Sequence, residues 1–329
     1  TFANMKKIIL FLAVVSLPKL GFSQFKWDFG GSLGASNYLG DIGGKDKPRR
    51  DFIYDMNLTQ TRLAAGGFAR YKLTPVISLK TSLNYIRIQG NDALSPNPER
   101  FSRNLSFRNN MFELSTVGEY YFYKSSDMSG RPGLRGSRKR VDFRTYVYAG
   151  IGALYSNPQA QYKGSWVNLR DYRTENVNYG PITVVVPIGL GFTYTINRHY
   201  RFGFDFGFRQ TFTDYLDDVS TNYVSEVFEG ENVPLGAAYA TDRANLANRN
   251  VELTESASSK IGPANYGWTK EFNGDKLNKR GDDTHNDNYL TASISFSYVI
   301  KGKNKFYKQK YKSLSQRRKV VKRKTRAKF

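Results

Sequence analysis

The sequence predicts an all-β fold, an eight-stranded antiparallel transmembrane β-barrel with long exterior loops and a basic C-terminal tail. Three observations predict it. Polar and apolar residues alternate with a period of two in eight segments, most of these run for roughly 9–14 residues, and short connections alternate with long ones. Globular strands average about five or six residues, whereas a tilted strand needs about 9–11 to cross a bilayer. Length and even number together favour a barrel that crosses a membrane.

Composition excludes several other classes of protein. The 329 residues include no cysteine, which excludes disulfide frameworks, Cys-ligated zinc and thiol chemistry. His199 and His285 are the two histidines of the chain, which argues against an ordinary multi-histidine metal site. The sequence has no apolar run of about 18 residues, so a helical membrane protein is excluded as well.

The N-terminus has the pattern of an export signal. Lys6 and Lys7 precede the apolar stretch 8–17, and Gly21 and Ser23 supply the small residues of a cleavage site. We therefore assign 1–23 to a few upstream residues and a secretory signal peptide, 24–300 to the barrel and 301–329 to the tail. A buried strand or helix is the alternative interpretation of the apolar stretch.

The alternation is clearest in 201–209, where four phenylalanines at every second position face away from Arg201, Asp205 and Arg209. A strand places successive side chains on opposite faces, so each segment has one apolar and one polar face. Phe68 interrupts this pattern in its segment. The eight predicted strands are 27–36, 63–72, 77–85, 112–122, 144–153, 183–195, 201–209 and 289–300.

The polar faces are rich in Gly and Ser with charges of both signs, which suits the side-chain-filled lumen of a narrow barrel. Isolated charges there would be costly to desolvate, so we expect ion pairs. The candidate acids are Asp28, Glu113, Glu119 and Asp205, and the candidate bases are Arg70, Lys80, Arg144, Arg201 and Arg209. In the alternative, a secreted soluble β-sandwich, the apolar faces would form the core.

The connections predict the orientation. Those at 74–75, 124–141 and 197–199 alternate with longer ones at 39–61, 89–107, 156–181 and 212–287. Short turns are periplasmic and long loops extracellular in outer-membrane barrels. The prediction is therefore an outer-membrane protein with both termini in the periplasm.

A filled eight-stranded barrel argues against a general porin, and enzymatic signals are weak. Asp282, Asp283 and His285 could act as a general base or bind a cation, but a solvated loop end explains the same residues. Asp217 and Asp218 could ligate calcium or form turns through side-chain hydrogen bonds. We predict no enzyme activity, no cofactor and no small-molecule substrate.

The positive charge is concentrated in the tail. Residues 301–329 hold 14 Lys/Arg and no acid, whereas 24–300 carry 33 basic and 28 acidic residues. Such a tail could bind nucleic acid, form a solvated extension, or dock on an acidic periplasmic protein or anionic lipid; export argues against nucleic acid. The predicted partner-binding residues are Arg131, Arg135, Arg138, Lys139, Arg140, Lys303, Lys305, Phe306, Tyr307, Arg317, Arg318, Lys319, Lys322, Arg323 and Lys324.

Five short motifs add a family resemblance. In order they are Asn-Tyr-Leu-Gly-Asp at 37–41, Tyr-Leu-Asp-Asp-Val-Ser at 215–220, Leu-Ala-Asn-Arg at 246–249, Arg-Gly-Asp at 280–282 and Asp-Asn-Tyr-Leu at 287–290. The region 24–300 resembles the PorG family of Bacteroidota outer-membrane barrels, components of the type IX secretion system. The basic tail is not part of this pattern.

The resemblance implies a non-catalytic component of a secretion machine that is linked to gliding motility. Its implied partners are outer-membrane lipid and a periplasmic ring made of a lipoprotein and its soluble partner. We expect the barrel to anchor or position this ring through its turns and tail. The alternative is a stand-alone small porin-like or adhesin-type surface barrel that acts through its exterior loops.

Overall fold

Eight antiparallel strands close into a barrel in the computed structural model. The model describes residues 25–44, 56–95, 98–126, 141–196, 199–221, 236–249, 252 and 280–301. Each barrel strand pairs with the barrel strands that precede and follow it in the sequence. The first strand also pairs with the last, which closes the barrel. The strands are β1 (Phe25–Leu39), β2 (Arg62–Lys72), β3 (Ile77–Asn91), β4 (Ser106–Ser126), β5 (Val141–Tyr155), β8 (Ile182–Ile196), β9 (Tyr200–Thr211) and β10 (Asn288–Lys301).

All eight predicted strands are confirmed, although several are longer than predicted. β3 continues to Asn91 and β4 begins at Ser106, so this pair rises well past the last predicted residues. The sequence pattern ends earlier because the loop-side ends of these strands are buried by other loops. There Ile86, Ile88 and Phe107 lie inside a packed cluster, where simple polar alternation no longer applies.

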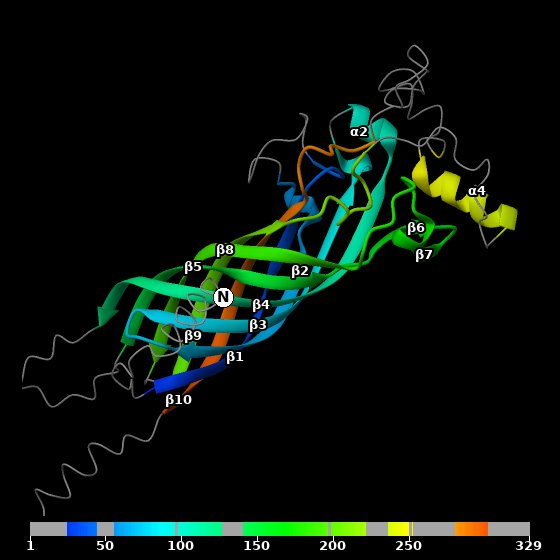
Figure 1. The fold of residues 1–329 in the computed structure, drawn as a ribbon. Helices are drawn as coiled ribbons and strands as arrows, with labels where there is room; N and C mark the ends of the chain where they lie inside the picture. The colour runs from blue at the N-terminus through cyan, green and yellow to red at the C-terminus, as the bar shows by residue number, and fades with distance from the viewer. Residues whose placement is uncertain are drawn as a thin grey trace, which may run out of the picture.

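The two ends of the barrel differ. Phe25 pairs with Lys301, so β1 begins and β10 finishes at one end, together with the β2–β3 turn, the end of β8 and the start of β9. In that β2–β3 turn Ile77 donates its backbone N–H to Thr74 Oγ1 at 2.9 Å. We call this the turn end. The opposite, loop end carries the long connections, and Figure 1 shows α2, α4, β6 and β7 gathered there.

The long connections contain short helices and strands that were not predicted from the sequence. Residues 156–181 contain a hairpin whose first strand adds to β4, because Arg108 pairs with Gln159. Apart from the twelve-residue α4, these elements are three to six residues long, which is too few to show a clear period of alternation. They are η2 (Leu58–Gln60), η3 (Asp92–Leu94), α2 (Pro98–Arg103), β6 (Pro158–Tyr162), β7 (Ser165–Asn168), α3 (Leu169–Tyr172) and α4 (Gly236–Ala247).

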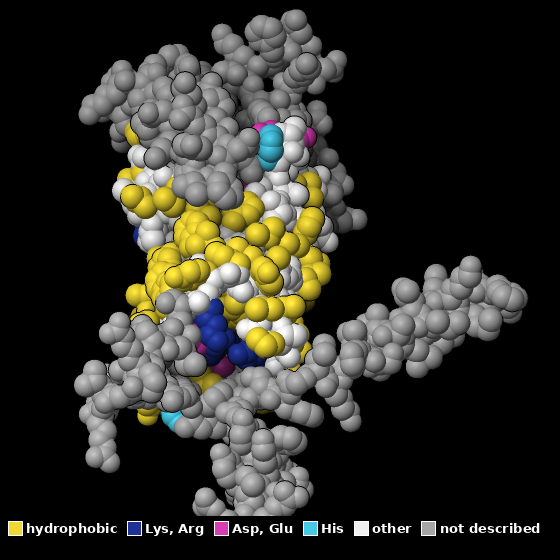
Figure 2. All heavy atoms as spheres, turned by 90° about the vertical axis from the view of Figure 1, so that its left-hand side faces the viewer, with side chains coloured by type: hydrophobic (Ala, Val, Ile, Leu, Met, Phe, Trp, Pro, Cys, Tyr) yellow, Lys and Arg dark blue, Asp and Glu magenta, His cyan; other side chains and the backbone are white. Residues whose placement is uncertain are grey.

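The barrel turns its apolar faces outward and its polar faces inward. Leu33, Ile151 and Ile294 are each more than 60% exposed on three different strands, whereas Asp28, Arg70 and Glu119 are at most 3% exposed. Figure 2 shows the exposed apolar side chains as a band across the middle of the visible face. No helix among the described residues has the length and apolar character needed to cross a membrane.

Glycines on the inner face make room for large inward side chains. A Cβ on Gly207 would lie 2.0 Å from Tyr148 Oη, and one on Gly191 would lie 2.8 Å from Tyr146 Cζ. Such contacts are too close for carbon, and at Gly191 the backbone carbonyl oxygen of Phe204 would lie closer still, at 2.6 Å, so movement of the ring would not make room there. The buried Tyr146 and Tyr148 lie over neighbouring strands and fill the lumen with Val117 and Tyr121.

Candidate functional site: a filled lumen closed by a folded cap

A buried ion-pair network crosses the lumen near the turn end. Arg70 Nη1 lies 2.8 Å from Asp28 Oδ2, and Arg70 Nε lies 2.8 Å from Glu119 Oε2. Arg201 reaches the same Asp28 carboxylate from β9. These contacts link β1, β2, β4 and β9 across the interior. Because both partners are buried, each charge depends on the others for compensation.

Further pairs extend the network towards the loop end. Lys80 Nζ lies 3.1 Å from Asp205 Oδ2, and Tyr146 donates to the other oxygen of that carboxylate. Glu113 lies 3.6 Å from Arg209 and accepts a 2.8 Å hydrogen bond from Tyr289 Oη. The predicted pairing of inward acids and bases is thus confirmed for these residues.

Arg144 is the exception to the predicted pairing. It binds Asp142, two residues earlier on β5, at 2.5 Å, rather than any of the four acids proposed from sequence. Asp142 faces inward on the same strand and is the nearer partner, because residues i and i+2 share one face of a strand.

Phe68, which interrupts the alternation of β2, has a specific place in this network. Its side chain is 7% exposed and points inward, and the ring centroid lies 5.1 Å from Arg70 Cζ and 4.8 Å from Lys80 Nζ. A cation above an aromatic face is attracted to the ring. Phe68 therefore supports two of the buried cations instead of facing outward.

The lumen also contains a small polar cavity of about 40 Å³. Its lining includes Ser82, Asn84, Ser115, Asp205 and Arg209. A volume of this size holds a few water molecules and excludes a solute. The described part of the interior is thus occupied by paired side chains at the level of Arg70, and it contains a cavity of this small volume beside Asp205.

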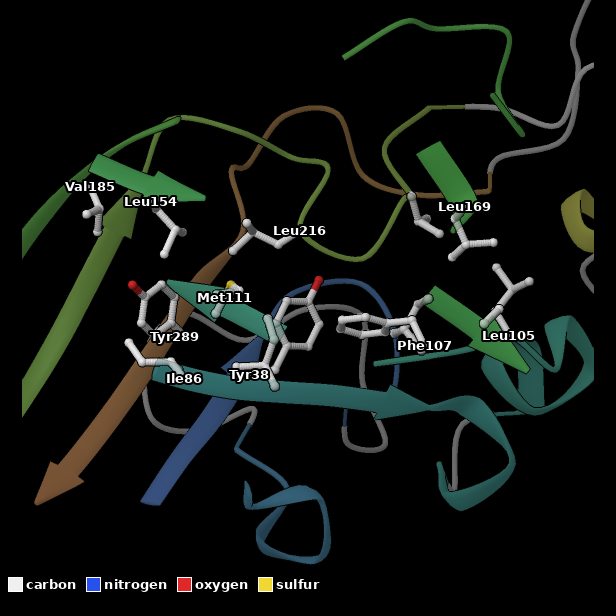
Figure 3. Packing of buried hydrophobic residues seen from close by; sticks show 14 of the residues in the cluster. Tyr38, Ile86, Leu105, Phe107, Met111, Leu154, Leu169, Val185, Leu216 and Tyr289 are labelled. Carbon is white, nitrogen blue, oxygen red and sulfur yellow. The ribbon is translucent and has the colours of Figure 1, made fainter. Parts of the chain in front are cut away.

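Above the lumen, the described parts of the long connections form a folded cap. We define the cap as residues 40–44, 56–61, 92–95, 98–105, 156–181, 212–221, 236–249 and 280–287. Its apolar core joins the loop-side ends of the strands, where Tyr38, Met111 and Tyr289 meet Leu216 and Leu169 from the connections (Figure 3). Residues from connections far apart in sequence are therefore packed in one cluster.

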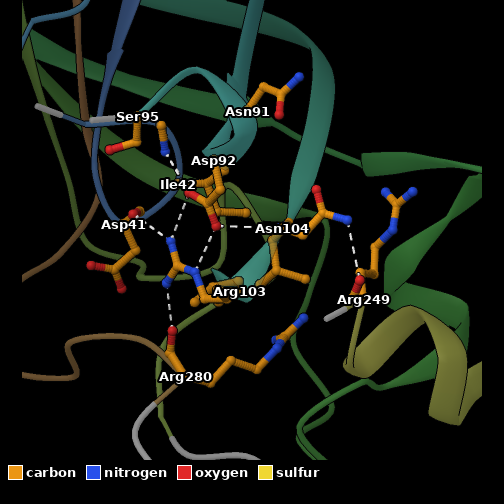
Figure 4. Close-up of polar contacts among 12 residues, drawn as sticks. Asp41, Ile42, Asn91, Asp92, Ser95, Arg103, Asn104, Arg249 and Arg280 are labelled. Atoms are coloured by element: carbon orange, nitrogen blue, oxygen red, sulfur yellow. Dashed lines mark hydrogen bonds and ion pairs between the residues drawn. The ribbon is translucent and has the colours of Figure 1, made fainter. Parts of the chain in front are cut away.

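Two arginines, the half-buried Arg103 and the buried Arg280, tie the connections of the cap together. Arg103 Nε lies 2.7 Å from Asp92 Oδ2, while its Nη1 and Nη2 donate to the carbonyls of Arg280 and Asp41 at 2.5 and 2.7 Å (Figure 4). Arg280 in turn lies 2.8 Å from Glu175 and donates to the carbonyls of Asp218 and Ala247. Four connections are held by these two side chains.

Aspartates complete the cap by accepting backbone hydrogen bonds. Asp287 accepts from Tyr38 Oη at 2.5 Å and from the Leu216 N–H at 3.0 Å. Asp217 accepts from the N–H groups of Val219 and Ile42 at 2.9 and 3.2 Å. Burial, with neighbouring carboxylates adding to it, raises the pKa of both Asp217 and Asp287 well above the ordinary range.

The five motifs quoted from the sequence all meet in or beside this cap. Tyr38 belongs to the first, Asp217 to the second, Ala247 to the third, Arg280 to the fourth and Asp287 to the fifth, and each makes one of the contacts just described. Sequence reasoning identified the motifs but not their common purpose. The signal available was that the first, second and fifth motifs lie at or close to strand ends.

The residues considered for cation binding lie in two different settings. Asp217 bonds the N–H two residues later, which is the turn-forming hydrogen bond considered from sequence. His285 is exposed at the rim, where its Nδ1 lies 3.2 Å from Asp282 Oδ2 and 2.7 Å from Thr284 Oγ1. Among the described residues, no group of three or more His, Asp or Glu side chains is placed to hold a metal ion.

The residues predicted to bind a partner lie outside the described structure. Residues 127–140 contain the five basic candidates of the β4–β5 connection, and 302–329 contain the ten of the tail. Both segments leave the barrel at the turn end, after Ser126 and Lys301. Their role in binding stays a prediction.

These features define a class of protein: a closed eight-stranded barrel with an apolar outer face, a polar filled lumen and a folded cap at one end. The chain belongs to the family described as domain of unknown function DUF6089, whose model matches residues 6–230. No curated protein matches it.

Solved structures of small barrels are similar to this chain. The N-terminal β-barrel domain of Pseudomonas aeruginosa OprF matches at 11% identity with a TM-score of 0.33, over 84% of this chain and 100% of that one. Neisserial surface protein A matches at 6% and 0.35, over 83% and 97%. Yersinia pestis Ail, in complex with the heparin analogue sucrose octasulfate, matches at 7% and 0.31, over 84% and 99%.

Proposed function

We propose that the protein is a non-catalytic outer-membrane barrel that acts by contact at its two ends. One observation carries this proposal: apolar side chains cover the outside of the barrel, while ion pairs fill its interior. This is the reverse of a water-soluble protein, in which the apolar face is inside. On β3 the outward apolar positions run from Ile77 to Tyr85, roughly 26 Å at about 3.3 Å per residue. That length is of the same order as the roughly 25 Å apolar band of membrane barrels.

The proposed orientation places the turn end in the periplasm and the cap outside the cell. Because the chain has no cysteine, a single introduced thiol reports the side on which it lies. Lys163, in the β6–β7 turn of the cap, has a 68% exposed side chain, and Thr74 lies in the β2–β3 turn. With Lys163→Cys, intact cells should react with an impermeant maleimide, whereas Thr74→Cys should react only after the outer membrane is opened. The opposite pattern would reverse the orientation, and recovery of the protein in the soluble fraction would reject the membrane location.

We further propose that the turn end docks on the periplasmic ring of a type IX secretion machine. The family resemblance and the 14 basic residues of the tail support this proposal, because such a tail attracts acidic partners. Deleting 302–329 leaves β10 intact, so the barrel should still assemble. Under the proposal the deletion abolishes copurification of the ring lipoprotein and impairs secretion. Unchanged copurification would remove the tail from the interface.

The second candidate is a surface barrel that acts through its exterior end. The folded cap favours it, because Arg103 and Arg280 join four connections there through hydrogen bonds and ion pairs. A rigid exterior surface is what recognition of an external ligand requires. Shortening 222–279 should impair function under this candidate and leave secretion intact, the reverse of the result expected for deletion of the tail.

A further inference from the structure

Two arginines face outward just beyond the apolar band at the loop end. Tyr85 and Phe112 form an outward-facing aromatic pair across β3 and β4. The next outward pair along these strands is Arg87 with Asn110, and the one after that is Gln89 with Arg108. Since each step is two residues, Arg87 lies about 7 Å past the aromatic pair. In the proposed orientation this is the headgroup level of the outer leaflet.

These two cations have no acidic partner among the described residues. The ion pairs there use other bases, and Arg87 and Arg108 are close enough for their charges to repel. Arg87 Nε is buried and finds no hydrogen-bond partner within the same residues. Two neighbouring guanidinium groups without a counter-charge repel each other, and an anion placed beside both would relieve that repulsion.

The β6–β7 hairpin holds one of the arginines in place. Arg108 Cζ lies 3.6 Å from the centroid of the Trp166 ring, and its Nε donates to Gln159 Oε1 at 3.1 Å. Gln159 is itself fixed, because its amide donates to Asn168 Oδ1 at 2.9 Å. The hydrogen bonds of the described residues leave the terminal nitrogens of Arg108 unused. Trp166 is 43% exposed, so the stacked pair lies at the surface.

We propose that Arg87 and Arg108, with Trp166 as a support, bind a phosphate group of an anionic glycolipid in the outer leaflet. Guanidinium groups match phosphate oxygens with paired hydrogen bonds, which favours this anion. A lipid fits better than free phosphate, because Tyr85 and Phe112 lie directly below and the 54% exposed Leu63 lies beside Arg87 on the neighbouring strand, where they can contact acyl chains. This inference rests on the membrane orientation proposed above.

The test compares retention of lipid by the purified full chain in detergent, measured by native mass spectrometry. The probes are diphosphorylated lipid A, its enzymatically dephosphorylated form, phosphatidylglycerol and inorganic phosphate. The variant Arg87→Gln/Arg108→Gln removes two charges from the site, and Lys72→Gln/Lys124→Gln removes two from the turn end as the matched control. Each arginine–phosphate contact is charge-assisted, so the first variant should lose about tenfold or more in lipid A affinity. Trp166→Leu should show a smaller loss.

The expected result is that lipid A binds the wild type and the turn-end variant equally well, and binds the Arg87/Arg108 variant weakly. Equal loss in both double variants would show general charge attraction and overturn the site. Equal binding of dephosphorylated lipid A would exclude phosphate recognition, and full competition by inorganic phosphate would show a free-anion site instead. Flotation of each variant with lipid vesicles is scored separately. If the wild type fails to float with the vesicles, the membrane proposal is contradicted. If the wild type floats but retains no lipid A in the mass spectrum, this inference alone is contradicted.

Discussion

Arg70 carries a positive charge in a buried part of the lumen. It is 2% exposed and contacts Asp28 and Glu119, which are both buried. A buried ion pair contributes little net stability compared with apolar packing, but removing one partner leaves the other charges uncompensated. The sensitivity of the barrel to mutation should therefore be concentrated at this residue.

We predict that Arg70→Met lowers the free energy of unfolding by about 3–5 kcal/mol. The measurement is urea unfolding of the barrel in lipid vesicles at pH 7. Lys163→Met is the matched control, because it also breaks an ion pair with an aspartate. That pair, Lys163 with Asp242, lies at an exposed position. The control should unfold like the wild type. If both variants were equally stable, the ion pairs of Arg70 would not be needed to compensate the charges of Asp28 and Glu119.

Asp218 makes the cap sensitive to pH. Its carboxylate accepts hydrogen bonds from Thr174 at 2.5 Å and Tyr179 at 2.6 Å, in a fully enclosed position. Burial raises the pKa of Asp218 to about 6, with Glu175 adding to the rise and Arg280 opposing it. A carboxyl whose pKa is higher in the folded state stabilises the fold below its unfolded pKa of about 3.8. That stability is lost as pH rises to about 6.

We therefore predict that the cap opens more readily at pH 7 than at pH 4, with the raised pKa values of Asp217 and Asp287 acting in the same direction as that of Asp218. Amide hydrogen exchange of residues 212–221, corrected for its intrinsic pH dependence, measures the opening. Asp218→Asn imitates the neutral form, so it should reduce this dependence and leave the part that Asp217 and Asp287 contribute. Asp283→Asn, outside the cap core, should leave it unchanged. A flat profile in the wild type would contradict the assigned shift.

At the scale of elements, the strands are amphipathic in the sense opposite to those of soluble sheets. Ile151 is 62% exposed near the middle of β5, and Ile182 is 69% exposed at the loop-side start of β8. In water the two positions would tolerate a charge equally, since both are open. In a bilayer the central position is costly and the edge is not. Depth along the strand thus separates a lipid-facing surface from a merely exposed one.

We predict that Ile151→Arg destabilises the barrel by about 2–4 kcal/mol in vesicles, whereas Ile182→Arg costs about 0–1 kcal/mol. Reversible urea unfolding in the presence of vesicles gives both values. The pair is matched in residue type, exposure and introduced charge, so the difference reports depth. Similar costs at both positions would contradict a lipid-facing outer surface.

At the scale of the whole molecule, the barrel could be predicted from the sequence and the cap could not. Strand positions follow from local alternation, as in 201–209, because each strand has one face towards the lumen. Inward pairing was predictable in kind, since buried charges need partners, but the choice of Asp142 for Arg144 depends on side-chain reach. The cap depends on contacts between distant segments, such as Tyr38 with Asp287, separated by 249 positions. No local pattern encodes that distance.

The filled interior predicts that the molecule does not conduct ions. Phe68, Arg70 and Tyr146 occupy one section of the lumen, and Tyr289, Glu113 and Arg209 occupy the next. Both sections lie beneath the cap, whose apolar core includes the buried Leu216. An ion would have to displace buried, paired side chains at each level, which costs several kcal/mol per broken pair. Wild-type protein in planar bilayers should therefore produce no discrete current steps.

The control is a variant with a deliberately widened lumen, Phe68→Ala/Arg70→Ala/Tyr146→Ala. It leaves Glu119 without its cation and Asp28 with Arg201 alone, so water and cations can enter the vacated section. With the cap also shortened by deletion of 222–279, this variant should give small, cation-selective steps. Vesicle flotation establishes that both proteins are inserted before currents are compared. Wild-type steps as large as those of the widened variant would show a water-filled bore and contradict action by contact alone.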